Sequence, residues 1–479
     1  MSERIALPDA HVRVLDGSPA VLRRLAAMRP RDYPVLLESV ADGPLGRASV
    51  LAAKPRAALW LDAEGRIGAT GAVPRGESFL SSLERWWLAE RVTDEADARP
   101  EVPFAGGWVL YLGYEVAQEV EPRLTLPRGP LPWRAFALRT PCALVHLHAT
   151  DQLLAVAEPE AASVLDALAS DVDWASGPDA AARDAAASAP LTLRIVEEDP
   201  ARFLERVQRA QAYIGAGDIY QANLSRDWRV LPEPAHRAGR HGLSVGELYA
   251  RLSAANPAPF AALAQWGDMA ILSSSPERLI RLQSRDVETR PIAGTRPRSR
   301  RPGGDAVEAA ALIAHPKERA EHIMLIDLER NDLGRVCEAG SVHVDELMVT
   351  ETYAHVHHIV SSVRGRLRAG VTPIGALRAV FPGGTITGCP KFRCMQIIAE
   401  LEGEGRGAYT GSLGFLTRSG AMDLNILIRT LTVLDGQVGF RAGAGIVADS
   451  VPERELEETR AKARGLLAAF DGSASGASP

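Results

Sequence analysis

The segment after Asp199 most constrains the fold, because a helical period is followed there directly by a strand period. Asp199 is a good helix N-cap residue, and Pro200 suits the first helical position. Glycines at 215 and 217 favour the end of this helix, and residues 218–225 then alternate apolar and polar side chains, which is typical of a strand. The apolar residues of the helix recur at spacings of four, three and four on one face: Phe203, Val207, Ala210 and Ile214.

The 479 residues are too many for one small domain, and 46% hydrophobic and 24% charged residues are an ordinary globular composition. We expect either two domains or one large interwoven α/β unit. Residues 159–190 are rich in Ala, Asp and Ser, which favours a surface helix followed by a loose linker. The expected units are an N-terminal region (1–158), this linker (159–190), a catalytic domain (191–468) and a disordered tail (469–479).

Charge and composition exclude several classes of protein. The net charge of −6 gives the chain no reason to bind nucleic acid or an anionic membrane. No apolar run approaches the roughly 20 residues that span a bilayer, and the N-terminus lacks the apolar core of a signal peptide. Four cysteines are too few for a disulfide scaffold, so we expect a cytoplasmic protein without a membrane partner.

Two pairs of carboxylates have the spacing of one helix face. Glu318 and Glu321 are three residues apart, as are Glu455 and Glu458. Two such pairs from distant segments can build an all-oxygen site for a hard cation such as Mg²⁺. The alternative is a solvated helix surface with salt bridges to basic neighbours.

Two glycine-rich turns are candidate ligand sites. Residues 381–391 precede a helical pattern, and free backbone N–H groups at a helix start bind anions. Gly388 is followed by Cys-Pro, so this is not a nucleotide-binding P-loop; a carboxylate ligand or a purely structural turn remains. The second turn, at 442–445, ends a predicted strand and would allow a ligand close to the backbone.

Arg429 and a histidine cluster complete the candidates. Arg429 ends an apolar strand pattern that starts at residue 422, and a buried guanidinium needs an anion, either a ligand carboxylate or an internal Asp or Glu. His355, His357 and His358 occupy another predicted strand. Zinc is disfavoured because no zinc motif is present, so we expect one of these histidines to act at a small-molecule site.

Together these segments resemble the chorismate-utilising enzymes. The similarity follows the order and spacing of that family's signature blocks across about residues 190–468, and is weaker at 36–39 and 106–108. The six matching blocks are Gly217-Asp-Ile-Tyr-Gln-Ala-Asn-Leu, Ser275-Pro-Glu-Arg, Arg290-Pro-Ile-Ala-Gly-Thr-Arg-Pro-Arg, Asp327-Leu-Glu-Arg-Asn-Asp-Leu-Gly-Arg-Val, Phe381-Pro-Gly-Gly-Thr-Ile-Thr-Gly and Ala442-Gly-Ala-Gly-Ile-Val-Ala-Asp-Ser.

The resemblance implies an α+β fold, an α/β sandwich of two large sheets packed together and flanked by helices. It also implies a site that holds Mg²⁺ and chorismate, a dicarboxylate. Matching positions make Glu321 and Glu458 the expected metal ligands, with Glu318 and Glu455 supporting them through water.

The same resemblance assigns the other site residues. Glu277 and His358 match the acid/base residues, and Thr385 matches a group beside the ring carboxylate. Gly443 and Gly445 match the backbone that approaches the substrate. The expected clamp on the enolpyruvyl carboxylate is Tyr409, Arg429 and Lys462.

Two branches of the family share all these blocks. Gln221-Ala-Asn-Leu and Pro382-Gly-Gly-Thr resemble aminodeoxychorismate synthases, which we expect here. Ala293 points instead to anthranilate synthases, because many aminodeoxychorismate synthases carry a nucleophilic lysine at this position. Either enzyme would take ammonia from a separate glutamine amidotransferase partner. Ser39 and Pro257 resemble a pocket that can hold tryptophan.

Overall fold

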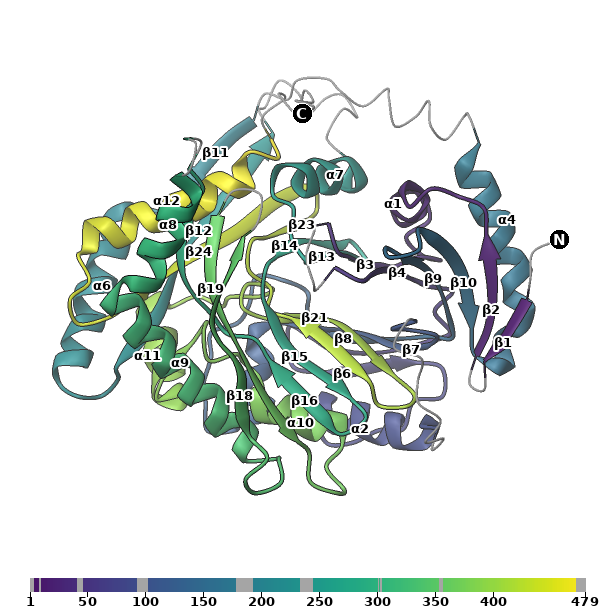
Figure 1. Cartoon of the computed structure of the whole chain (residues 1–479), viewed down its shortest axis with the longest axis horizontal. Helices are drawn as coiled ribbons and strands as arrows, with labels where there is room; N and C mark the ends of the chain where they lie inside the picture. The colour runs from purple at the N-terminus through teal and green to yellow at the C-terminus, as the bar shows by residue number, and fades with distance from the viewer. Residues whose placement is uncertain are drawn as a thin grey trace.

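The computed structural model describes residues 4–7, 10–40, 46–92, 102–177, 193–232, 244–299, 301, 304–352 and 356–470. Two large antiparallel sheets, of 13 and 11 strands within these residues, form the body of the molecule (Figure 1). This confirms the predicted fold of two sheets with flanking helices. Among the described residues, no helix is long and apolar enough to cross a membrane.

The first sheet joins the two ends of the chain. Its strands, in spatial order, are β1 (Arg4–Leu7), β2 (Ala10–Leu15), β10 (Gln152–Ala157), β9 (Cys142–Leu147), β4 (Ala48–Ala53), β3 (Val35–Glu38), β13 (Phe260–Trp266), β14 (Met269–Ser275), β23 (Thr430–Leu434), β24 (Gln437–Ile446), β12 (Gln221–Pro232) and β11 (Leu193–Glu197), with β20 (Gly388–Cys389) beside β12.

The second sheet also combines strands from the N-terminal and C-terminal halves of the chain. Its strands, in order, are β17 (Ile292–Pro297), β19 (Val356–Arg366), β16 (Asp286–Thr289), β15 (Arg278–Gln283), β22 (Met422–Asn425), β21 (Ser412–Thr417), β7 (Gly107–Leu112), β8 (Trp133–Thr140), β5 (Ala57–Asp62) and β6 (Ile67–Thr70), with β18 (His343–Thr352) beside β19.

Strands from the two halves of the sequence are direct neighbours in both sheets. Leu36 of β3 pairs with Leu263 of β13, and Leu110 of β7 pairs with Gly414 of β21. Each sheet therefore contains strands from both halves of the sequence. The chain is one interwoven unit rather than two side-by-side domains.

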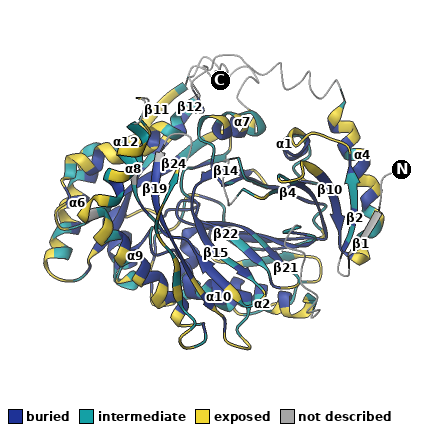
Figure 2. Cartoon of the chain, viewed as in Figure 1, coloured by how far each residue is buried: buried dark blue, intermediate teal, exposed yellow. Residues whose placement is uncertain are grey.

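Apolar clusters lie both between the two sheets and under the helices on their outer faces, because strand residues alternate between two apolar faces. Val35 packs between the sheets with Val109 and Ile271, whereas its neighbour Leu36 faces the helices. Figure 2 shows the central strands buried and the helices exposed on their outer sides, whereas the outer strands β11 and β18 are largely exposed.

Helices cover the outer faces of both sheets. Those on the first sheet are α1 (Ala20–Met28), α4 (Leu165–Ser176), α7 (Val245–Ala255) and α12 (Pro452–Leu467). Those on the second are α2 (Phe79–Glu90), α9 (Pro316–Gly334) and α10 (Pro373–Val380). Helix α11 (Lys391–Glu402) packs on β12 and β20 of the first sheet. The others are α3 (Ala117–Val120), α6 (Pro200–Gly215), α8 (Gly304–Ala314), and the 3₁₀ helices η1 (Tyr114–Val116) and η2 (Pro159–Val164).

Several local predictions can be compared with these elements. The predicted helix after Asp199 is confirmed as α6, and the Asp199 carboxylate accepts a hydrogen bond from the Ala201 N–H at 2.9 Å. The following strand starts only at Gln221, three residues later than predicted. The predicted linker begins with η2 and α4, and α4 buries Leu168 and Val172 against the first sheet, so residues 159–176 belong to the fold. Residues 178–190 and 471–479 lie outside the described residues.

The predicted single strand at 422–430 is wrong. β22 ends at Asn425 in the second sheet, and β23 begins at Thr430 in the first. The four residues between them cross from one sheet to the other. Arg429 ends this crossing with a positive φ of 51°, and its carbonyl accepts a hydrogen bond from the Ser274 N–H at 3.0 Å.

Candidate active site

The predicted site residues come together where the two sheets meet. They are supplied by β12 and β24 of the first sheet, β17 and β19 of the second, helices α9 and α12, and the loops 381–390 and 403–411. Figure 1 shows α9, α11 and α12 on the same side of the molecule as β12, β19 and β24. Segments more than 200 residues apart in sequence thus share one site.

The first part of the site is a group of carboxylates around Glu321. Glu318 and Glu321 lie one turn apart on α9, and Gln221 of β12 donates to Glu321 Oε1 at 2.8 Å. Burial, then repulsion from Glu318 and Glu458, raises the pKa of Glu321 to about 7. A Cβ at position 445 would lie 2.5 Å from the Gln221 amide nitrogen, so a larger residue there would displace this amide from Glu321.

Helix α12 supplies the second carboxylate pair. Glu458 pairs with Lys462 at 2.8 Å, and both side chains are close to half exposed (47% and 43%). The Lys462 ammonium also donates to the carbonyl of Gly443 at 2.9 Å. Glu455 is buried one turn earlier on α12. Within the described part of the chain, no three His, Cys, Asp or Glu side chains form a preformed metal centre.

Tyr409 lies against the strand that carries the two predicted glycines. Its hydroxyl is within 3.4 Å of the Asn223 amide nitrogen. A Cβ at position 443 would come within 2.5 Å of that hydroxyl, so only glycine admits Tyr409 here. Both glycines lie within β24 rather than in a turn, and they allow the Tyr409 and Gln221 side chains to approach the backbone closely; the ligand contact stays a prediction.

Arg429 and His358 meet across the two sheets. An Arg429 Nη lies 3.2 Å from His358 Nε2. Burial, and then the charge of Arg429, lowers the pKa of His358 to about 3. The imidazole is therefore neutral at physiological pH, and its Nε2 accepts the guanidinium hydrogen bond.

Glu277 is the buried acid of the site. Thr385 donates from its hydroxyl to Glu277 Oε1 at 2.8 Å, and the Ile292 N–H approaches the same oxygen at 3.4 Å. Burial raises the pKa of Glu277 to about 8 despite these hydrogen bonds. Glu277 is thus protonated at neutral pH, with Oε2 left to carry the proton. Ala293, next to Ile292 in β17, is buried as well.

The predicted tryptophan pocket corresponds to a separate cavity of about 290 Å³ between the sheets. Ser39 lines it, and the buried Ser39 hydroxyl has no hydrogen-bond partner among the described residues. Pro257 does not line this cavity; Pro259 and Phe260 do. The assignment of Ser39 and Pro257 to a tryptophan pocket stays a prediction.

Other predictions have different outcomes. His357 pairs with Asp305 at 3.4 Å and contacts the Thr352 hydroxyl at 2.9 Å, away from the site residues, and His355 lies outside the described residues. The amides of Gln221 and Asn223 touch Glu321 and Tyr409, roles that the sequence pattern did not reveal.

Carboxylates on one side and Arg429, Lys462 and a neutral histidine on the other define a site for a small ligand with acidic groups. The sequence profile of the family described as chorismate binding enzyme matches residues 38–468. The chain belongs to this family and is an enzyme that acts on chorismate, of the anthranilate or aminodeoxychorismate synthase type.

Three relatives illustrate the similarity. Anthranilate synthase component 1 of Streptomyces coelicolor is 44% identical over 96% of this chain and 88% of its own. Aminodeoxychorismate synthase of Streptomyces griseus is 37% identical over 97% of this chain and 66% of its own. The crystal structure of anthranilate synthase component I from Streptococcus pneumoniae superposes with a TM-score of 0.74 at 29% identity, covering 89% of this chain and 93% of that one.

Proposed function

We propose that the protein is an aminodeoxychorismate synthase subunit, which converts chorismate and ammonia to 4-amino-4-deoxychorismate and water for p-aminobenzoate and folate synthesis. A glutamine amidotransferase partner would supply the ammonia. The supporting observation is the start of β12, where Gln221 and Asn223 belong to the pattern that resembles these synthases. Their side chains contact Glu321 and Tyr409, so the pattern is part of the site.

The cationic side of the site suits the enolpyruvyl carboxylate. Arg429 can bind a carboxylate with two parallel hydrogen bonds, and Tyr409 and Lys462 are its proposed companions. The ring carboxylate would lie toward Thr385 and the backbone of Gly443 and Gly445.

Mg²⁺ is the proposed cofactor, and the donor set fits it. Burial raises the pKa of Glu321, and the nearby Glu318 and Glu458 carboxylates raise it further; a hard cation would relieve that repulsion. Mg²⁺ would supply a positive charge that withdraws electron density as the ring hydroxyl leaves. In the structure Glu458 is held by Lys462.

Glu277 and His358 are the proposed proton carriers. Protonated Glu277 would donate to the departing C4 hydroxyl, which leaves as water while a C–N bond forms at C4. Neutral His358 would take the proton that the ammonia nitrogen loses. Its low pKa arises after burial from Arg429 and Lys462, and a bound carboxylate would neutralise both charges and raise it.

Anthranilate synthesis is the second candidate, favoured by Ala293. This small buried residue adjoins Ile292, whose N–H approaches Glu277. It leaves space for ammonia at C2 in place of a lysine amine, and amination at C2 followed by loss of pyruvate gives anthranilate. The alternative also has the name of the Streptomyces coelicolor relative in its support.

One experiment distinguishes the two products. The pure chain is incubated with chorismate, Mg²⁺ and ammonium, pyruvate is measured with lactate dehydrogenase, and the product is identified by mass. We expect no pyruvate, and p-aminobenzoate only after an aminodeoxychorismate lyase is added. Stoichiometric pyruvate with blue anthranilate fluorescence would establish the second candidate. Glutamine should not replace ammonium unless the partner is present.

A further inference from the structure

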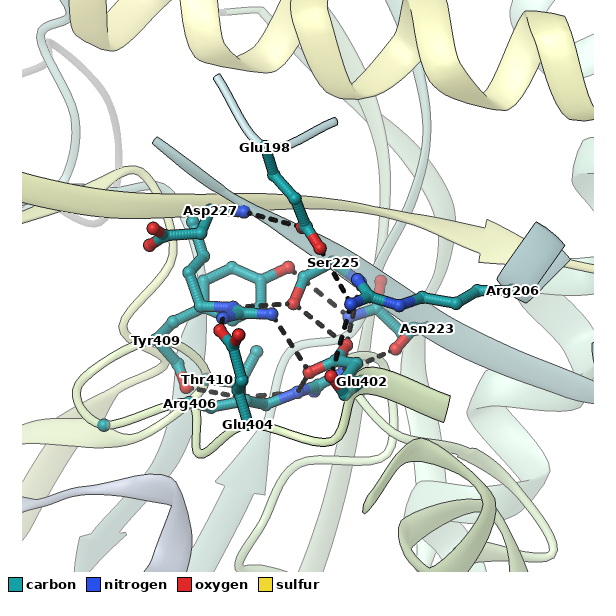
Figure 3. Close-up of polar contacts among 12 residues, drawn as sticks. Glu198, Arg206, Asn223, Ser225, Asp227, Glu402, Glu404, Arg406, Tyr409 and Thr410 are labelled. Atoms are coloured by element: carbon teal, nitrogen blue, oxygen red, sulfur yellow. Dashed lines mark hydrogen bonds and ion pairs between the residues drawn. The ribbon is translucent and has the colours of Figure 1, made fainter. Parts of the chain in front are cut away.

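A buried ionic network lies behind Tyr409 (Figure 3). Its centre is the pair of Glu402, at the end of α11, and Arg406, four residues later; each is 2% exposed. Arg406 donates to Glu402 through two nitrogens, Nε to Oε2 at 3.0 Å and Nη2 to Oε1 at 2.7 Å. This two-pronged geometry fixes the plane of the guanidinium.

Glu402 is anchored independently of Arg406. Its Oε1 accepts hydrogen bonds from both the N–H and the hydroxyl of Ser225 at 2.9 Å, and Arg441 approaches Oε2 at 3.4 Å. Arg441 also donates to the Ser225 hydroxyl at 3.0 Å. Burial acts to raise the pKa of Glu402, but the positive charges of Arg406 and Arg441 have the larger combined effect. The pKa therefore lies below its usual value. Glu402 is therefore an ionised carboxylate fixed to β12 and β24.

The Arg406 nitrogens also contact residues beside the active site, in addition to Glu402. Nη2 donates to the Asn223 carbonyl at 2.6 Å, and Nη1 donates to the Ile386 carbonyl at 3.1 Å. Nη1 also lies 3.4 Å from the Thr410 hydroxyl. The guanidinium carbon is 5.5 Å from the centre of the Tyr409 ring, within cation–π range.

These contacts join three separate segments that line the site. Asn223 lies two residues after Gln221 in β12, Ile386 follows Thr385, and Thr410 follows Tyr409. Thr410 has a positive φ of 63°, a strained conformation for a β-branched residue that its surroundings must hold in place. A single guanidinium thus sets the spacing between β12 and the neighbours of Thr385 and Tyr409, two residues predicted to contact chorismate.

We propose that Arg406 is a positioning residue for the carboxylate clamp, and that Glu402 fixes Arg406 for this task. Arg406 does not reach the substrate; it acts through Asn223 and Tyr409. The inference rests on the proposed role of Tyr409 in binding the enolpyruvyl carboxylate. Its predicted signature is a loss of substrate binding rather than of chemistry, because Glu277 and Thr385 keep their own hydrogen bonds.

The test uses Arg406→Lys, which keeps the charge but cannot reproduce the fork. We expect the chorismate KM to rise at least about tenfold while kcat falls less than about threefold, since small misplacements of binding groups are costly. Glu402→Gln should give the same split together with a lower Tm. Glu400→Gln is the matched control, because Glu400 lies on α11 two residues away, is 46% exposed and pairs with Arg209 at the surface.

A double-mutant cycle with Tyr409→Phe separates positioning from general destabilisation. If Arg406 acts through Tyr409, the KM effects of Arg406→Lys and Tyr409→Phe will be strongly non-additive. Additive effects, or equal losses in kcat and kcat/KM, would overturn the proposal. If the wild-type chain does not aminate chorismate, the proposed function fails instead, and the same cycle is then measured as chorismate Kd by calorimetry.

Discussion

The two sides of the active site are built differently. The carboxylate side, with Glu458 47% exposed and balanced by Lys462, lies on the solvent-facing helices α9 and α12. The opposite side contains Glu277, His358 and Tyr409, all buried and held by hydrogen bonds from neighbouring strands and loops. The first side is a set of like charges that a cation can reorganise, and the second is preorganised before any ligand binds.

The largest effect is expected when a carboxylate of the first side is replaced by a neutral amide. Glu321→Gln should lower kcat by at least about a thousandfold if the group binds Mg²⁺, because an amide is a weaker ligand than a carboxylate. The fold should be retained, since removing a carboxylate that is repelled by its neighbours does not cost stability. Turnover and thermal melting test both statements, with Glu457→Gln, an exposed neighbour on α12, as control. Near-normal turnover would remove Glu321 from the metal site.

On the buried side, Glu277→Gln should lower kcat/KM by about 10²–10⁴-fold, the usual contribution of a positioned acid. The glutamine can still accept the Thr385 hydrogen bond, so melting should change little. Thr385→Ser is a fitting control because it retains the hydroxyl that contacts Glu277. A loss of less than about threefold would mean that another group donates the proton.

The pH dependence of kcat/KM is a second test of Glu277 as the proton donor. The pKa of Glu277 is raised to about 8, so the protonated acid predominates below pH 8 and is lost above it. Wild-type kcat/KM should therefore fall as pH rises through about 8. Steady-state rates from pH 6 to 10 would reveal this limb. Glu277→Gln should lack it, and an unchanged limb in that variant would assign it to a different group.

Arg429→Lys should have an intermediate effect. Lysine cannot make the two parallel hydrogen bonds of a guanidinium, so the chorismate KM should rise by about 10–100-fold, the equivalent of about 1.5–3 kcal/mol for a charged hydrogen bond. Arg460→Lys, at the surface of α12, is the control and should leave KM unchanged. An unaltered KM in Arg429→Lys would show that Arg429 serves the protein interior instead.

The smallest effect is expected for Ala293→Lys. Related synthases carry lysine at this position, and the new ammonium would find the Glu277 carboxyl nearby, because Ile292 contacts it. We expect a Tm within about 3 °C of wild type, which corresponds to a loss of no more than about 3 kcal/mol in a protein of this size. Thermal melting checks this, and a much larger drop would mean that the pocket beside Ala293 is closed.

Local sequence patterns predicted the helices and strands well, but they predicted the tertiary contacts between these elements less well. The spacing of Glu318 and Glu321 placed both on one face of α9, because i, i+3 geometry is fixed within any helix. That α9 and α12 are neighbours does not follow from spacing, and only the family resemblance suggested it. The apolar run at 422–430 was misinterpreted because both of its ends are buried, one in each sheet, and a continuous apolar pattern does not reveal such a crossing.

Arg406 shows why part of the site was missed. It lies between Gly405 and Gly407, where sequence rules predict an exposed turn. Its burial depends on Glu402, Ser225 and Asn223, and the last two are about 180 residues away along the chain. Such a partner set has no local signature.

The mixed strand order of the two sheets has a consequence for how the protein is made. During synthesis β3 emerges long before its neighbour β13, and β7 long before β21. The nascent N-terminal strands therefore have unsatisfied edges until most of the polypeptide has left the ribosome, which slows folding and exposes the chain to aggregation. Helix α12 follows all of these strands in the sequence and carries Glu458 and Lys462, so a translation product that ends before α12 would lack these two residues of the proposed site.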